Sequence, residues 1–205
     1  QSMIKIMKYG QVPNSEIFAR VSPAVNVEGI VADIIANVRA NGDKAVLEYN
    51  LKFDKAELSS LLVSQEEIEE AFAAVEPRFL SILEQAAENI QAFHSKQVRN
   101  SFVIADRPGI VLGQKVTPIE NVGVYVPGGT AAYPSTVLMD TIPAKIAGCS
   151  QIVMVTPPGK DGKINPVILA AAKIAGVDRI FKIGGAQAVA ALAYGTETVP
   201  KVDKI

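Results

Sequence analysis

Two polar side chains lie where predicted strands give way to glycine-containing loops. Tyr125 lies near the end of a strand predicted over 122–126, and Gln187 lies in the first turn of a helix that follows Gly184-Gly185. Ligands of open parallel sheets bind beyond the carboxyl ends of the strands, where a phenol or an amide can hydrogen-bond to a polar group. Both residues are therefore candidate ligand contacts. Each also fits a structural role, as a half-buried strand aromatic or as a helix-start residue bonded to backbone.

The loops that carry these residues, Tyr125–Pro134 and Gly184–Gln187, are rich in glycine. Glycine lets the backbone approach a ligand closely, and the helix N-terminus that follows each loop favours an anion such as a pyrophosphate. Neither loop has the G-x-G-x-x-G spacing, and no P-loop pattern is present. The glycines are equally consistent with tight strand-to-helix turns, so both interpretations stay open at this point.

The chain has one histidine, His94, and one cysteine, Cys149. Zinc sites usually draw on several such side chains, and nothing marks partners for a Ser-His-Asp triad. His94 falls late in a predicted helix and favours a structural or solvated position. Cys149 follows Gly148 among apolar residues and is typical of a small buried side chain. We therefore expect no catalytic and no metal-ligating residue in this segment.

Composition narrows the class of protein. The chain has 205 residues, 49% of them hydrophobic, and 20 Lys+Arg balance 21 Asp+Glu. This suits one large or two small folded domains, and excludes disordered or fibrous chains. The net charge of −1 creates no field that would attract nucleic acid or an anionic membrane surface. No apolar run approaches the ~20 residues that span a bilayer, and the lone cysteine suits a reducing, cytoplasmic compartment.

The second half of the chain alternates strands and helices with short links. The predicted order is strand 122–126, helix 134–147, strand 152–155, helix 166–175, strand 179–183 and a helix ending near 194–195. Such alternation indicates an α/β fold with a Rossmann-like parallel sheet flanked by helices. The run 201–205 suggests the entry to another strand, so we expect the sequence to continue.

The first half is mainly helical. Predicted helices cover 27–38, ending at Asn41-Gly42, then 43–53, a third opened by the Ser64–Glu67 capping box, and a fourth from Pro77 to about Lys96. A short hairpin is predicted over 101–118. We expect a helical segment with a hairpin over 1–120 and a Rossmann-like half-domain over 121–205. The apolar helices could pack on the sheet or on a partner chain.

Several stretches of the chain closely resemble the histidinol dehydrogenase family. The most specific are VGVYVPGGTAAYPSTVLMDTIPAKIAGC (122–149), VMVTPPGKDGKI (153–164) and GGAQAVAALAYGTETVPKVDKI (184–205). Weaker matches are GDKAVLEYNLKFD (42–54), AAENIQAFHSKQ (86–97) and PGIVLGQKVTPIENVG (108–123). The resemblance therefore extends over nearly the whole chain.

The resemblance implies a fold similar to that of aldehyde dehydrogenases and a zinc-dependent homodimer. The implied reaction oxidises L-histidinol to L-histidine through the aldehyde with two NAD⁺, the last two steps of histidine biosynthesis. Tyr125 and Gln187 match the tyrosine and glutamine that contact NAD in the family. A third contact, the asparagine of a G-P-G-N motif, would follow Ile205. The zinc ligands, a glutamate–histidine acid/base pair and the substrate-binding carboxylates would lie beyond it too.

These implications lead us to expect an amino-terminal portion that is inactive alone and holds at most a weak NAD site. A stand-alone NAD- or ligand-binding module without catalysis is the alternative from another functional class. A third possibility is an aldehyde dehydrogenase relative with another substrate, which would need a nucleophilic cysteine that Cys149 does not provide.

Overall fold

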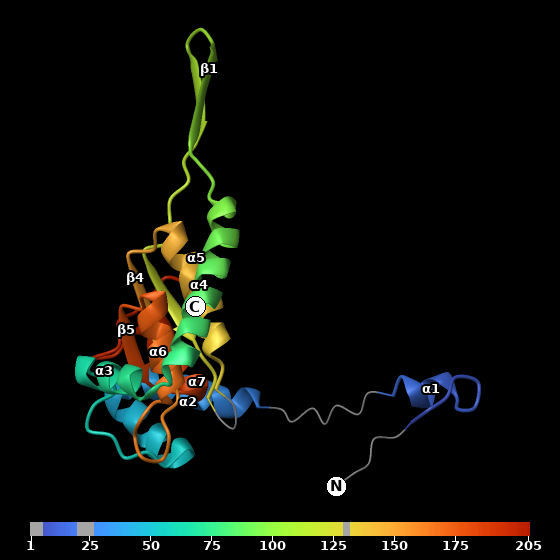
Figure 1. Ribbon diagram of the computed structural model, residues 1–205, viewed down its shortest axis with the longest axis vertical. Helices are drawn as coiled ribbons and strands as arrows, with labels where there is room; N and C mark the ends of the chain where they lie inside the picture. The colour runs from blue at the N-terminus through green and yellow to red at the C-terminus, as the bar shows by residue number, and fades with distance from the viewer. Residues whose placement is uncertain (1–5, 20–26, 129–131) are drawn as a thin grey trace.

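A three-stranded parallel sheet forms the centre of the computed structural model, which describes residues 6–19, 27–128 and 132–205. Its strands are β3 (Asn121–Tyr125), β4 (Gln151–Thr156) and β5 (Arg179–Lys182), in the order β3-β4-β5 (Figure 1). All three predicted strands are confirmed to within a residue at each end. The middle strand β4 is buried from its second residue to its last, as expected of a parallel strand covered on both faces.

Helices cover both faces of this sheet, as the alternation predicts. The helices α5 (Pro134–Ala147) and α6 (Pro166–Ala175) pack with Met154 and its neighbours in one apolar cluster. The helix α7 (Gly185–Tyr194) packs in a second cluster, which contains Val155 on the opposite face of β4. Because side chains alternate along a strand, each face of β4 contributes to a different cluster. The bounds of α5 and α6 match the predicted ones.

The first predicted pair of helices forms the element α2 (Glu28–Tyr49), which is two helical segments joined at a kink. The predicted stop at Asn41-Gly42 is confirmed, because Gly42 has a non-helical backbone there, with φ of +53°. The carboxylate of Glu197 lies against Gly42 and accepts a hydrogen bond from the Asp43 N–H at 2.7 Å, so the chain turns there and resumes its helix. The predicted end of the second helix, at residue 53, is wrong. A π-helical turn, η1 (Asn50–Asp54), replaces it, and the buried Asn50 amide donates to the Lys182 carbonyl at 2.7 Å.

The next two helices confirm the prediction. The helix α3 (Gln65–Ala74) begins with the Ser64–Glu67 capping box, in which each side chain accepts from the other residue's backbone N–H. The helix α4 (Pro77–His94) starts at its proline and continues into a short 3₁₀ turn, η2 (Ser95–Gln97). The helix α2 packs against α7, α3 against α6, and α4 against α5 and α6. The apolar helices of the first half therefore pack on the layers of their own sheet.

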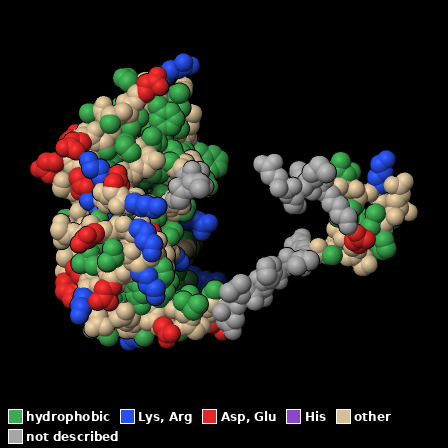
Figure 2. All heavy atoms as spheres, turned by 90° about the horizontal axis from the view of Figure 1, so that it is seen from below, with side chains coloured by type: hydrophobic (Ala, Val, Ile, Leu, Met, Phe, Trp, Pro, Cys, Tyr) green, Lys and Arg blue, Asp and Glu red, His purple; other side chains and the backbone are tan. Residues whose placement is uncertain are grey.

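Two elements lie outside this layered body. The short helix α1 (Asn14–Ile17) stands apart from it, and the antiparallel hairpin of β1 (Phe102–Arg107) and β2 (Ile110–Gln114) projects from its end (Figure 1). Figure 2 shows both signs of charge on the face viewed from below, in keeping with the balanced composition. No helix in the described part of the chain is long and apolar enough to cross a membrane.

Candidate active site

Tyr125 joins the carboxyl end of β3 to the start of α7. Its side chain is half-buried in the cluster beneath α7, and its hydroxyl accepts a hydrogen bond from the Gly185 N–H at 3.1 Å. The phenol therefore passes the end of the middle strand and caps a free N–H in the first turn of the helix. The residue sits at the edge of the sheet where the parallel topology predicts it.

Gln187 lies in the same first turn and is 2% exposed. Its Oε1 would lie 2.6 Å from a Cβ at Gly185, so the amide folds back over that glycine. Gly185 has φ of +61°, a left-handed conformation that favours glycine, and any larger residue would displace the amide. Tyr125 and Gln187 are thus brought together against a single residue, Gly185.

Pro157 links the two glycine loops that the sequence singles out. A Cβ at Gly128 would lie 2.3 Å from the Pro157 ring, and a Cβ at Gly184 would lie 2.6 Å from it. The proline follows β4 and occupies the gap between the loops after β3 and β5. These two glycines are required for close packing whatever else the loops do. Residues 129–131 of the first predicted loop lie outside the described residues.

A cavity of about 710 Å³ opens beside Pro157 at the carboxyl ends of β3 and β4. Its apolar wall includes Pro127, Pro158 and Ile168. The charged residues of the loop after β4 that line it are Lys160, Asp161 and Lys163. Neither Tyr125 nor Gln187 is among its described lining residues. The candidate residues and the cavity therefore occupy adjoining positions at one end of the sheet, with Pro157 lining the cavity.

The loop after β4, residues 157–163, is the part of this site that sequence reasoning missed. Its sequence is typical of a connecting loop, yet it contributes six of the described residues that line the cavity. Its shape comes from local bonds: Asp161 accepts from the Lys163 N–H at 3.1 Å, and the Gly159 N–H donates to the Lys163 carbonyl at 2.8 Å. The same strand-end rule that singled out the other two loops would have found it.

Asp54 is another part of this site that the sequence does not reveal. It reaches the cavity wall from the end of η1, and its Oδ2 is buried without a hydrogen-bond partner among the described residues. Burial raises the pKa of this carboxyl. A covered carboxylate oxygen without a donor is costly, so the geometry favours a ligand that supplies a hydroxyl or amino hydrogen.

These groups define the chemistry that the cavity can perform. Prolines and an isoleucine can hold a flat ring, the lysines can neutralise an anion, and Asp54 can accept from a hydroxyl or amine. This combination suits a nucleotide. The described lining residues thus offer groups that can bind and orient a ligand.

His94 and Cys149 lie away from this site. The Nδ1 atom of His94 is 2.7 Å from Oε1 of Gln97, at the end of α4, and Cys149 is half-buried against the cluster that contains α5. Among residues 6–19, 27–128 and 132–205, no three His, Cys, Asp or Glu side chains are grouped as metal ligands. The described part of the chain therefore offers no fit for the zinc that the resemblance implies.

Comparisons with known proteins agree on one family. The sequence model described as histidinol dehydrogenase matches residues 19–205. A histidinol dehydrogenase of Clostridium acetobutylicum is 52% identical over 210 residues, which cover 100% of this chain and 49% of that protein. One from Bacillus subtilis is 55% identical over 175 residues, covering 85% of this chain and 41% of that protein.

A solved structure gives the same result for the fold. The crystal structure of histidinol dehydrogenase from Elizabethkingia anophelis superposes with a TM-score of 0.87 at 42% identity. The match covers 95% of this chain and 46% of that one. The chain thus spans about half the length of the relatives that it matches.

Proposed function

Because this chain belongs to the histidinol dehydrogenase family, we propose that it forms the NAD-binding part of an enzyme that oxidises L-histidinol to L-histidine through the aldehyde. Two NAD⁺ would be reduced in succession, in the last two steps of histidine biosynthesis. The chain's share of that work is to bind and orient the dinucleotide. The observation that carries this proposal is the meeting of Tyr125 and Gln187 at Gly185, beside a cavity suited to a nucleotide.

NAD⁺ supplies the hydride acceptor when it is bound. In our proposal Tyr125 and Gln187 hydrogen-bond to the dinucleotide, and the cavity beside Pro157 takes one of its two nucleotides. The Tyr125 hydroxyl can still donate its own hydrogen while it accepts from Gly185. The Gln187 side chain is 2% exposed, so its amide can present only a small surface to a ligand.

We assign the zinc ligands, the acid/base pair and the substrate carboxylates to the part of the family proteins that this chain does not match. The described residues offer no group of metal ligands, and the chain covers 49% of its Clostridium acetobutylicum relative. The 205-residue chain should therefore bind NAD⁺ without oxidising L-histidinol. We further propose that the enzyme is a cytoplasmic homodimer.

The test is a calorimetric titration of the 205-residue chain with NAD⁺. We expect saturable binding with a dissociation constant of roughly 0.1–1 mM, because the site is only partly formed. Removing the Tyr125 hydroxyl in Tyr125→Phe should weaken binding at least about fivefold, a loss of about 1 kcal/mol. The matched control is Tyr194→Phe, which removes the hydroxyl of an exposed tyrosine at the end of α7.

Three outcomes would contradict parts of this proposal. Absence of binding at about 10 mM NAD⁺ would remove the dinucleotide site from this chain. Equal affinity of the two phenylalanine variants would remove Tyr125 from the contacts. Formation of NADH from L-histidinol by the 205-residue chain would show that its own residues suffice for the chemistry.

A further inference from the structure

A second cavity, of about 400 Å³, lies at the end of the sheet opposite to Pro157. Its walls come from the end of α4 and the residues after it, from the segment that joins β2 to β3, and from the last turn of α5. The last two walls lead directly into β3 and β4, so the cavity lies at the amino ends of those strands. It shares no described lining residue with the cavity beside Pro157.

Contacts within the chain hold two walls of this second cavity. The Ser101 hydroxyl accepts from the Val116 N–H at 2.8 Å and ties the chain that enters the hairpin to the chain that leaves it. The His94 imidazole is held from two sides. Its Nδ1 is 2.7 Å from Oε1 of Gln97, and its ring stands edge-on to Phe93 with 5.2 Å between the centroids. Such largely pre-formed walls are typical of ligand sites.

Most of the wall of the second cavity is apolar. The volume falls within the roughly 300–1,000 Å³ of ligand pockets, which combine an apolar lining with a few polar groups. The apolar lining residues are Val98, Val116, Pro118, Pro143, Ile146 and Ala147, and the polar ones are His94, Gln97, Arg99 and Thr117. The body of a ligand held there should therefore be apolar, with one polar group.

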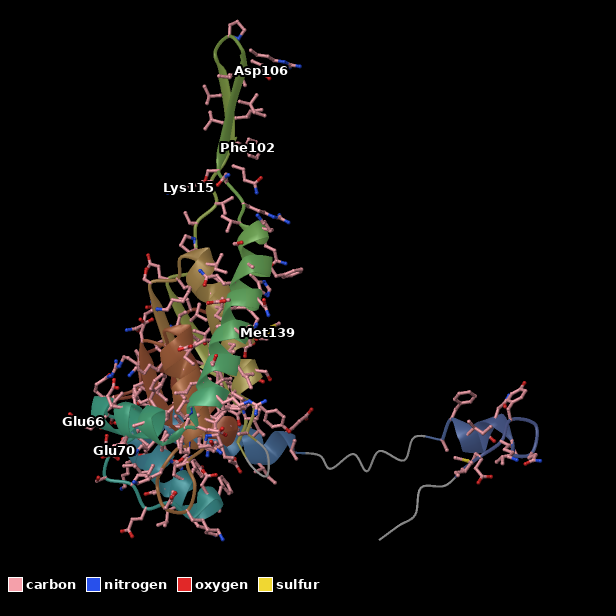
Figure 3. The ribbon with its side chains drawn as sticks, viewed as in Figure 1. Glu66, Glu70, Phe102, Asp106, Lys115 and Met139 are labelled. Carbon is pink, nitrogen blue, oxygen red and sulfur yellow. The ribbon has the colours of Figure 1, made fainter. Side chains whose placement is uncertain are left out.

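The charges around the second cavity favour an anion as that polar group. Arg99 carries a full positive charge, and no Asp or Glu is among the described lining residues. Immediate chain neighbours of the lining residues add Lys96 and Lys115, and Figure 3 shows Lys115 at the foot of the hairpin. A further neighbour, Lys145, is already paired with Asp178 at 2.9 Å. The other three cations have no ion pair within the described part of the chain.

Two helix ends limit how much negative charge the second cavity can hold. Both α4 and α5 end there, and the carbonyl end of a helix carries about half a negative charge. Together the two ends offset about one of the three unpaired cations, so a monoanion is still favoured. A phosphate dianion would lack the helix N-terminus that commonly binds it. A carboxylate is a monoanion that an arginine can bind through two parallel hydrogen bonds.

We propose that the second cavity binds a small monocarboxylate with an apolar body, and that Arg99 is its charge partner. This site is separate from the dinucleotide site and does not rest on it, because the two lie at opposite ends of the sheet. An acid bound there would contact the end of α4, the foot of the hairpin and the end of α5 together.

A titration of the 205-residue chain with 3-phenylpropanoate, followed in amide NMR spectra, tests the proposal. We expect saturable shifts at residues 94–99, 116–118 and 146–149, with a dissociation constant of roughly 0.1–2 mM for a ligand of this size. The uncharged 3-phenylpropanamide should bind at least about fivefold more weakly, because it lacks the charge that Arg99 recognises. NAD⁺ should not displace the acid.

Two results of this titration would overturn the site. The first is the absence of saturable shifts at about 10 mM acid. The second is a spread of shifts over the exposed strands β1 and β2, which would show adsorption to apolar surface. Neither result depends on whether the chain binds NAD⁺, because the calorimetric titration with NAD⁺ is read separately.

Two pairs of variants test the residues named. Arg99→Gln should weaken binding of the acid at least about fivefold, and the matched control Arg78→Gln changes an exposed arginine at the start of α4. Ala147→Phe should abolish binding by filling the cavity, and Ala73→Phe places the same ring at an exposed alanine near the end of α3. Unchanged signals from β4 would show that each variant is folded. Equal acid binding by the two glutamine variants would overturn the role of Arg99, and full binding by a folded Ala147→Phe would overturn the cavity.

Discussion

The middle strand of the sheet and the two strands of the hairpin are built from similar residues and end in opposite environments. The strand β4 reads QIVMVT and is buried over its last five residues, whereas β1 and β2 read FVIADR and IVLGQ and are exposed throughout. All three have the β-branched and apolar residues that favour strands. Strand formation is therefore a local property here, while burial depends on which elements the chain brings alongside.

The strand β4 and the hairpin also differ in what stabilises them. Helices on both faces of β4 place its side chains in two apolar clusters, so that strand contributes to the core on each side. The hairpin has no such layers among the described residues, so beyond the pairing of its own two strands it buries little surface. We therefore expect the body to respond strongly to substitution and the hairpin to respond weakly in dilute solution.

The largest effect should come from a matched pair of leucine truncations. Leu138 of α5 is 1% exposed, and Leu112 of β2 is 64% exposed. Leu138→Ala should lower the free energy of unfolding by about 2–5 kcal/mol, because it removes buried methyl groups and leaves a cavity. Leu112→Ala should change it by less than about 0.5 kcal/mol in the dilute monomer. Urea unfolding at low protein concentration gives both values. Similar losses would show that the hairpin is part of the core.

An intermediate effect is expected at Glu67, which caps α3 and joins it to β5. Its carboxylate accepts from the Ser64 N–H at 3.0 Å and from the Lys182 ammonium at 2.5 Å. Burial opposes its ionisation, but these bonds outweigh burial and hold its pKa below the ordinary value. Glu67→Ala should cost about 1–2 kcal/mol of unfolding free energy. Lys115→Ala, on the hairpin, should cost almost nothing by comparison.

The pH dependence of stability gives a second test of Glu67. A carboxyl whose native pKa is lowered stabilises the fold above its unfolded pKa, and the gain is lost as pH falls through the native value. Stability of the wild type should therefore decline as acid is added below the ordinary pKa of glutamate. In Glu67→Gln this decline should be shallower, and chemical unfolding at a series of pH values would detect it. An unchanged slope would exclude Glu67 as its source.

The smallest effect in the body is expected at Asp54 and has the opposite sign. Burial raises the pKa of this carboxyl, so its ionised form destabilises the fold, and the loss appears as pH rises through that raised value. At pH 7, Asp54→Asn should stabilise the chain by about 0.5–1 kcal/mol, allowing for its partial exposure. Asp106→Asn, on the exposed hairpin, should leave the stability of the dilute monomer unchanged.

The same variant also tests the nucleotide cavity. If Asp54 accepts a hydrogen bond from bound NAD⁺, Asp54→Asn should weaken binding while it stabilises the free protein. Calorimetry and urea unfolding on one preparation measure both effects. A variant that is more stable and binds NAD⁺ equally well would show that Asp54 has no part in recognition.

Local signals were enough to predict most elements of the fold. Proline at helix starts, glycine just past the ends of α5 and α6, and the Ser64–Glu67 box each act within a few residues. The helix break at Gly42 is also predicted by the sequence, and Glu197 lies against it. The prediction fails at the end of the following helix, where the bond from Asn50 to the distant Lys182 accompanies a π-helical turn in place of a regular helix end.

The candidate site also has features that the sequence predicts and features that only the structure shows. Topology and family resemblance both pointed to Tyr125 and Gln187, because the carboxyl end of a strand and the start of a helix can be recognised in the chain itself. Their meeting at Gly185, the position of Pro157 between two glycines and the arrival of Asp54 at the cavity could not be recognised. Each of these joins residues that are far apart in sequence.

The sequence by itself determined the elements, their parallel order and the family, since these depend on short-range propensity, periodicity and motifs. Only the tertiary structure decided which apolar strand is core and which is exposed surface. It also decided that the helices of the first half pack on the helices that flank the sheet, and that the Asp54 carboxylate has an oxygen without a hydrogen-bond partner among the described residues beside a cavity. The physical reason is that burial and hydrogen-bond satisfaction are properties of neighbours, and neighbours are assigned by packing.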